Sequence, residues 1–93
     1  MKTIETIYTV SDYLQSAERT LKYWNGQLEN LNNGTLEYDG SIPDSCYNAL
    51  IQRKVKLYTS VVDWLNTFDK DEVMGDNVGL TKLGAEYYKR VNA

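Results

Sequence analysis

The acidic segment before the C-terminal part of the chain holds the densest group of side chains that could do chemistry. Four carboxylates fall within eight residues there: Asp69, Asp71, Glu72 and Asp76. Paired carboxylates serve as acid and base in glycosidases, but on facing rigid elements rather than in one loop. A calcium-binding EF-hand loop starting at Asp69 would need glycine and glutamate where Met74 and Leu80 stand. We therefore interpret the segment as a solvated acidic loop.

Composition excludes most other catalytic and metal-binding chemistry. The chain contains no histidine and one cysteine, which removes Ser-His-Asp and Cys-His relays and the usual zinc sites. The glycines of segment 79–84 lack the Gly-Lys-Ser/Thr ending of a phosphate-binding loop. We expect a protein that is not an enzyme and has no catalytic residues, no metal and no cofactor.

The single cysteine and the apolar runs bear on location. Cys46 falls on the apolar arc of an expected helix, so we expect a buried, reduced thiol, as in a cytoplasmic protein. The N-terminal residues lack the apolar core of a secretion signal, and no run approaches the ~18 residues of a membrane span. A cytoplasmic location without membrane contact is the prediction.

The charge balance bears on the class of partner. A formal net charge of −3 and a pI near 4.8 disfavour binding to a phosphate backbone. Arg53, Lys54 and Lys56 are the only basic cluster within a helix, and on a helical wheel Lys54 points away from the other two. Nucleic acid is therefore not the expected partner.

Residues Pro43 to Phe68 are typical of one long helix that is apolar over about half its circumference. One apolar edge carries Cys46, Leu50, Leu57, Val61, Trp64 and Phe68. The other carries Tyr47, Ile51, Val55, Tyr58, Val62 and Leu65. Such a helix should touch two neighbours, or one neighbour and a partner chain. Lys54 lies between the edges, where it either reaches water or forms a register-fixing ion pair across helices or subunits.

An earlier helix is predicted by a heptad seam sustained over three repeats. The seam is formed by Val10, Leu14, Ala17, Leu21, Trp24, Leu28 and Leu31. Thr9 and Asp12 form a Thr-x-x-Asp start signal, and Gly34 can end the helix in a left-handed conformation. Gly26 marks either a bend or a close backbone approach. Tyr23 points away from the seam, toward water or a partner.

Three other segments complete the chain. Residues 2–10 are interpreted as helix or a helical turn, with a short extended arm as the alternative. The 33–42 loop carries Leu36 and Tyr38, which either cover the end of the bundle or serve a function. A last helix is expected from Leu80 to Asn92, where Gly84 would permit close packing.

These elements predict an all-α fold in which residues 1–93 form a single helical domain. Two long antiparallel helices form a hairpin, and a shorter third helix packs on the central one. One apolar edge of the central helix should face the heptad seam, and the other should face the last helix. If the last helix docks elsewhere, the edge with Tyr58 and Val62 is left for a partner.

The favoured function is a non-enzymatic protein-interaction module that could self-associate as a homo-oligomer. Its candidate contact residues are Tyr23, Leu36, Tyr38, Lys54, Tyr58 and Tyr88. The first alternative is a small acidic inhibitor of the phage or mobile-element kind, which mimics nucleic acid and blocks a defence protein through Asp69, Asp71, Glu72 and Asp76. A DNA-binding helical domain is the second alternative.

Overall fold

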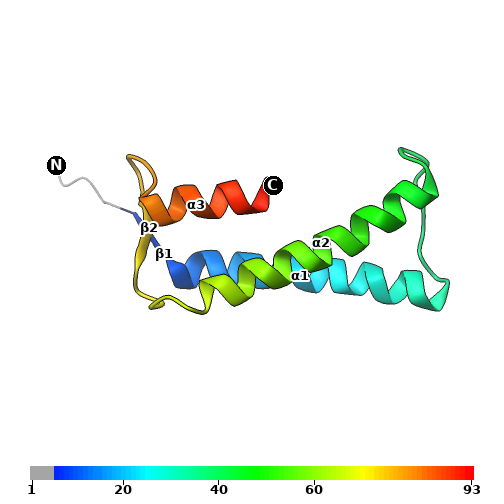
Figure 1. Ribbon diagram of the computed structural model, residues 1–93, viewed down its shortest axis with the longest axis horizontal. Helices are drawn as coiled ribbons and strands as arrows, with labels where there is room; N and C mark the ends of the chain where they lie inside the picture. Colours follow the sequence, from blue (N-terminus) through cyan, green and yellow to red (C-terminus); the bar gives the residue numbers. More distant parts are fainter. Residues whose placement is uncertain (1–5) are drawn as a thin grey trace.

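The computed structural model describes residues 6–93, and it confirms the antiparallel helical hairpin with a shorter third helix (Figure 1). A two-stranded sheet is also present. The elements in chain order are β1 (Ile7–Thr9), α1 (Val10–Asn33), α2 (Asp44–Leu65), β2 (Val73–Asp76) and α3 (Lys82–Val91).

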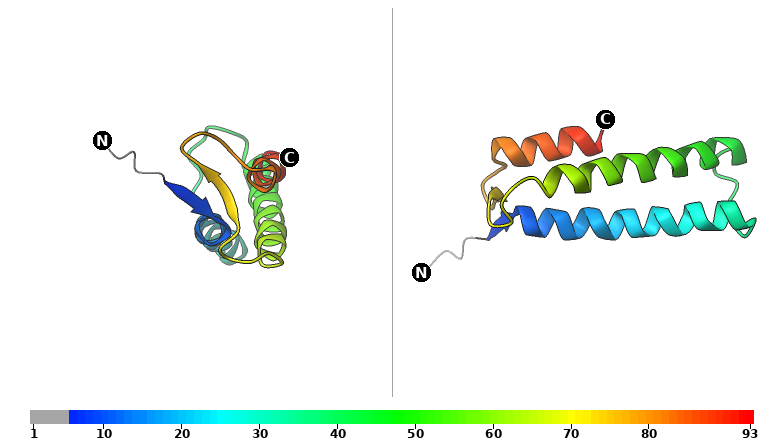
Figure 2. Two further views of the ribbon diagram at one scale, coloured as in Figure 1. Left: turned by 90° about the vertical axis from the view of Figure 1, so that its left-hand side faces the viewer. Right: turned by 60° about the horizontal axis from the view of Figure 1, so that its bottom comes forward.

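The first helix begins and ends where its sequence signals indicate. The backbone N–H of Thr9 donates to the Asp12 carboxylate at 2.8 Å, which confirms the Thr-x-x-Asp start. Gly34 follows the last turn with φ at 73°, a conformation that glycine adopts without a steric penalty. From there the chain turns through loop 34–43, and α2 runs back beside α1 (Figure 2).

The prediction of a helix or helical turn before Val10 is wrong for Ile7–Thr9, and residues 2–5 of that segment lie outside the described part. Ile7–Thr9 forms β1, which pairs antiparallel with β2. The β-branched residues favour a strand once a partner strand exists. The partner segment also supplies carbonyls to the start of α1: Val10 N–H donates to Glu72 at 2.8 Å and Ser11 N–H to Lys70 at 3.0 Å.

The second and third helices are shorter than predicted. α2 ends at Leu65 rather than Phe68, because the Thr67 hydroxyl and backbone N–H both bond to the Trp64 carbonyl, at 2.6 and 3.1 Å. α3 begins at Lys82, because the Thr81 hydroxyl accepts the Gly84 N–H at 3.2 Å as a helix cap.

α3 is held against β2 through a close approach at Gly84. A side-chain carbon at this position would overlap the carbonyl oxygen of Met74. The same oxygen accepts the backbone N–H of Thr81 at 3.1 Å. The predicted close packing at Gly84 is therefore confirmed. Gly26 has open space around its α-carbon, so no close backbone approach explains that glycine.

The hydrophobic core lies at the sheet end of the hairpin, where α1, α2, α3 and β2 meet. It is formed by Val10, Leu14, Ala17, Val61, Leu65, Met74 and Tyr87. Toward loop 34–43, the only buried side chain among described residues 20–57 is Ile51. The loop end of the hairpin is therefore two helices side by side with almost no core of their own.

The two apolar edges of α2 have different neighbours. Trp64, on the first edge, lies under the guanidinium of Arg90 in α3, 4.3 Å from the ring centre. Tyr47, on the second edge, accepts a hydrogen bond from Gln27 of α1 at 2.9 Å. Because α3 is short, it leaves the loop-end part of the first edge uncovered. The exposed Cys46 lies on that part, so the prediction of a buried thiol is wrong.

Candidate protein-interaction surface

Tyrosine side chains form two groups on the hairpin, one around the cleft between α1 and α3 and one where α1, α2 and loop 34–43 meet. We call the surface that they form the tyrosine face. It is formed by Tyr8, Tyr13, Tyr23, Tyr38, Tyr47, Tyr58, Tyr87 and Tyr88, which are all the tyrosines of the chain. Ring contacts join Tyr13, Tyr87 and Tyr88 in a cluster at the sheet end, and Tyr38 and Tyr47 in a cluster at the loop end.

Helix spacing explains how the two clusters are connected. On α1, Tyr13 and Thr20 are seven residues apart and share one face, whereas Tyr23 lies about 80° farther round the helix, beside Tyr47 of α2. On α2, Tyr47, Lys54 and Tyr58 recur at intervals of seven and four.

The sheet-end cluster lines a cleft of about 790 Å³ between α1 and α3, to which Tyr58 contributes from α2. The Tyr13 ring packs edge-on against Tyr87 at 4.8 Å and against Tyr88 at 5.9 Å between ring centres. Its hydroxyl lies 3.3 Å from that of Tyr88. Burial, followed by this hydrogen bond, raises the pKa of Tyr13 to about 12. Burial also raises the pKa of Tyr87, with a smaller contribution from Tyr58.

The loop-end cluster joins both helices and loop 34–43. The Tyr38 ring packs against Tyr47 with 6.0 Å between ring centres, and its hydroxyl donates to the Asn48 side chain at 2.6 Å. The Tyr23 ring packs against Trp24 at 5.1 Å. The nearby phenol of Tyr47, and then burial, raise the pKa of Tyr23. Loop 34–43 is thereby fastened onto the hairpin, which fits the interpretation of Leu36 and Tyr38 as a cover for its end.

The tyrosine face is only partly covered. Tyr87 is 7% exposed, whereas Tyr88 is 44% and Tyr23 is 57% exposed. Tyr8 and Tyr38 are exposed to a similar degree as Tyr88. Tyrosine rings with apolar bodies and polar tips are enriched in protein interfaces. The exposed rings therefore mark a surface that could bury further area against another protein.

The predicted contact residues largely lie on this face. Tyr58 and Tyr88 line the sheet-end cleft, Tyr23 and Tyr38 belong to the loop-end cluster, and Lys54 lies between Tyr47 and Tyr58 on α2. Leu36 is partly buried in loop 34–43. Sequence reasoning did not select the other four tyrosines of the face: Tyr8, Tyr13, Tyr47 and Tyr87.

A signal for Tyr47 was present in the sequence, because it lies seven residues before Lys54 on the same helical face. The pairing of Tyr13 with α3 depends on a contact 75 residues away in the chain, between its hydroxyl and that of Tyr88.

Lys54 is partly buried, and within residues 6–93 it takes part in no ion pair. The ion pair that the structure does contain joins Arg90 to Glu86, one turn earlier on α3, at 3.2 Å. The cross-helix ion pair considered for Lys54 is thus not formed among the described residues. A pair with another subunit stays a prediction.

The acidic segment lies at the sheet end, away from the exposed loop-end tyrosines. Asp69, Asp71 and Glu72 are exposed. Asp76 has a structural role, because its carboxylate accepts the backbone N–H groups of Val78 at 2.8 Å and Gly79 at 3.0 Å. Mimicry of nucleic acid stays a prediction. It would depend on the exposed Asp69, Asp71 and Glu72 more than on Asp76.

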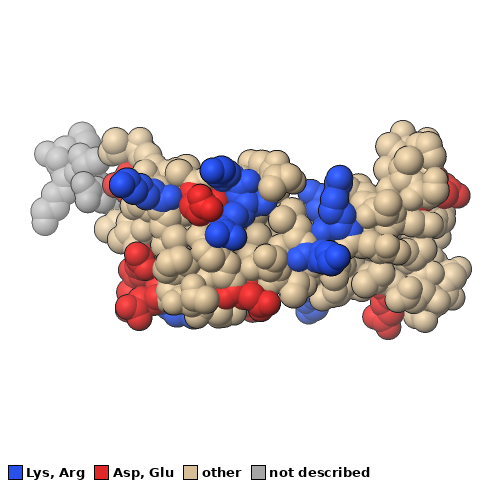
Figure 3. All heavy atoms as spheres, in the orientation of Figure 1, with Lys and Arg blue, Asp and Glu red and all other residues tan. Residues whose placement is uncertain are grey.

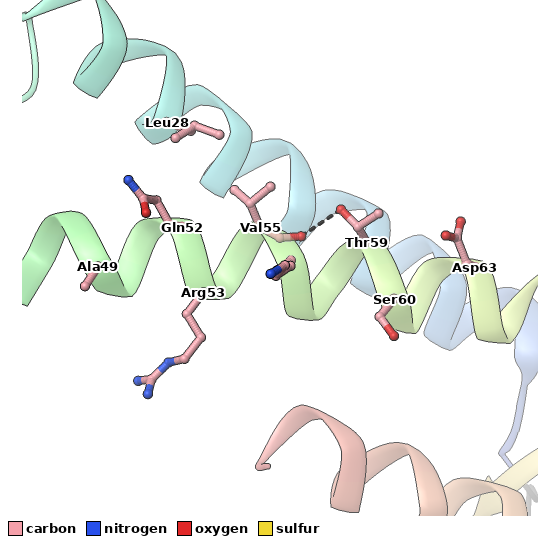
Figure 4. A pocket seen from close by; sticks show the side chains of 9 residues that line it. Leu28, Ala49, Gln52, Arg53, Val55, Thr59, Ser60 and Asp63 are labelled. Carbon is pink, nitrogen blue, oxygen red and sulfur yellow. Dashed lines mark hydrogen bonds between the residues drawn. The ribbon is translucent and has the colours of Figure 1, made fainter.

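A second hollow lies on the other side of α2, along its groove with α1 (Figure 4). Leu28 and Val55 give it an apolar part, while Arg53, Lys56 and Asp63 give it mixed charge. Figure 4 shows Arg53 and Ser60 pointing away from α1, whereas Val55 and Thr59 point toward it. The side chains do not converge on one point, so we assign no ligand to this groove.

The part of the chain that the structure describes, residues 6–93, holds neither a cluster of metal ligands nor a membrane-spanning helix. No group of three or more histidine, cysteine, aspartate or glutamate side chains is arranged there to hold a metal ion. None of its helices combines the length and apolar character that crossing a membrane requires. No protein-family model, curated protein or solved structure matches the chain.

Proposed function

We propose that this chain is a non-enzymatic protein-interaction module that binds its partner through the tyrosine face. The observation that carries the proposal is the clustering of all eight tyrosines in two groups, which Tyr47 and Tyr58 connect along one face of α2. Four of them, Tyr8, Tyr23, Tyr38 and Tyr88, keep a large part of their rings exposed. We place the module in the cytosol, where a single free cysteine such as Cys46 stays reduced.

Covering an exposed tyrosine ring of this surface would contribute favourable binding energy. A tyrosine buries roughly 150–250 Å² when fully covered, so a partner covering the 57% exposed ring of Tyr23 would remove roughly 100 Å² from water. At about 25 cal/mol per Å², this is worth about 2–3 kcal/mol before ordering costs. Tyrosine is among the residues that dominate measured binding energies.

Affinity capture with the full chain as bait tests the proposal, together with sedimentation of the purified protein to detect self-association. Tyr23→Ser should weaken the captured or self-formed complex about tenfold, which is the usual effect of losing an aromatic anchor. Val78→Ser is the matched control, because Val78 is an apolar residue that is 96% exposed and makes none of the ring contacts. Circular dichroism should show both variants folded.

Two outcomes would contradict the proposal. One is a chain that captures no protein and stays monomeric at millimolar concentration. The other is a complex that Tyr23→Ser and Val78→Ser affect equally.

A further inference from the structure

The tyrosine face is covered by α3 only at the sheet end. Ten residues of α3 span about 15 Å, whereas the 22 residues of α2 span about 33 Å. Beyond the last turn of α3, a stretch of about 18 Å of hairpin is therefore open as far as loop 34–43. Figure 3 shows this stretch as a notch in the outline of the molecule, between α3 and the loop.

The notch separates charges of opposite sign. Residues 23–52, which form the loop end of the hairpin, contain four acidic side chains and no basic one. The basic residues toward the sheet end of the notch are Lys54 on α2 and Lys89 and Arg90 on α3. On the side of the molecule that Figure 3 shows, Lys and Arg lie over the middle and the charged side chains at the loop end are acidic.

We infer that the notch is filled by the loop end of a second copy of this chain, turned antiparallel about a two-fold axis. This inference rests on the proposed function and names its partner. A two-fold rotation places the acidic loop end of each copy on the basic side of the notch of the other, so one arrangement satisfies both ends. A partner with charge of a single sign would be repelled at one end.

Lys54 gives this arrangement its most specific contact. Its ammonium is partly buried beside the apolar residues of α2 and finds no carboxylate within residues 6–93. Arg90, which also lies beside the notch, is already paired with Glu86 and stacked on Trp64. In the two-fold arrangement, Glu37 of the other copy reaches Lys54 and fixes the register, as polar residues do on helical seams.

Sedimentation of the full chain from micromolar to millimolar concentration, at low salt, tests this arrangement by charge reversal. Glu37 is the suitable acidic partner to change, because it is exposed, whereas Asp39 binds the Ser41 N–H at 2.8 Å and shapes the loop. Lys54→Glu and Glu37→Lys should each weaken dimerisation about tenfold or more, since a two-fold dimer contains every pair twice. The double variant should recover most of the loss.

Lys56→Glu is the matched control, because it makes the same charge change two residues away, at a side chain that lines the groove on the other side of α2. It should alter dimerisation less than about threefold. A chain that stays monomeric at millimolar concentration would overturn the inference. Failure of the double variant to recover, or equal effects of Lys54→Glu and Lys56→Glu, would also overturn it.

The inference and the proposed function can fail separately. If the chain is monomeric but captures another protein and loses it on Tyr23→Ser, the tyrosine face binds and only the second copy is wrong. If the charge reversals behave as expected but Tyr23→Ser has no effect, the dimer is right and the role of the tyrosine face is wrong.

Discussion

The close approach of α3 to β2 makes Gly84→Ala the most informative single substitution in this fold. A methyl group there would overlap the carbonyl oxygen of Met74 and lie 3.0 Å from its carbonyl carbon. These atoms belong to the backbone of a paired strand, so they cannot move aside as a flexible side chain could. Either α3 shifts away, or β2 distorts and the Thr81 N–H bond to the same oxygen is lost.

The expected change in the free energy of unfolding is the difference between two opposing effects. Alanine is better than glycine inside a helix by about 1 kcal/mol. Overpacking against a rigid neighbour costs about 1–3 kcal/mol or more, and partial undocking of α3 exposes Tyr87, which is 7% exposed in the native fold. We expect Gly84→Ala to lower the free energy of unfolding by about 2 kcal/mol. The midpoint of thermal unfolding should fall by about 8–16 °C.

Gly26→Ala is the matched control, since it makes the same chemical change in a helix where the added methyl meets open space. It should raise the free energy of unfolding by up to about 1 kcal/mol, through helix propensity. Thermal and urea unfolding followed by circular dichroism measures both variants. A Gly84→Ala protein as stable as Gly26→Ala would refute the close approach of α3 to β2.

Two further predictions concern the start of α1 and the sheet-end tyrosines. Asp12→Ala removes the acceptor for the Thr9 N–H, so the free energy of unfolding should fall by about 1 kcal/mol, as measured by thermal unfolding. Gln15→Ala, one turn later on the same helix, should not cause this loss. The pKa of Tyr13 is about 12 in the folded chain against 10.0 for the free group, so above pH 10 the unfolded chain loses this proton first. The free energy of unfolding should hold below pH 10 and fall as the pH rises toward 12, and it should fall less steeply in Tyr13→Phe. Urea unfolding at a series of alkaline pH values measures this dependence. An equally steep fall with pH in both proteins would contradict the prediction.

The two long helices could be predicted because their signals are local. The heptad seam from Val10 to Leu31, the Thr9–Asp12 start and the glycine stop at Gly34 all lie within the helix that they specify. Each acts through residues three to seven positions apart, which a helix brings together by its own geometry. The apolar edges of α2 were recognised for the same reason.

The sheet could not be predicted because its signal is shared between distant segments. Ile7–Thr9 has strand-forming residues, but a strand of three residues forms only against a partner. That partner is four residues, Val73–Asp76, within an acidic stretch that has the composition of a loop. Nothing local connects the two segments.

The exposure of Cys46 was missed for a related reason. The apolar edge that carries it is continuous in sequence, but only its Trp64 end meets α3. How far a short helix covers a longer one depends on where the short helix begins, and β2 and the Thr81 cap set that position. The tyrosine face could not be predicted for the same reason, because it depends on the position of α3 beside α2.

The pairing of β1 with β2 has a consequence for how the chain acquires its structure. Ile7 faces Asp76, so the sheet closes a loop of nearly seventy residues, whereas the α1–α2 hairpin is built from neighbouring segments. Local pairings form faster than distant ones, because less chain must be ordered before a contact is gained. During synthesis the hairpin can therefore assemble while β1 still waits for its partner to leave the ribosome. Over that interval the first two amides of α1 lack the carbonyls of Lys70 and Glu72.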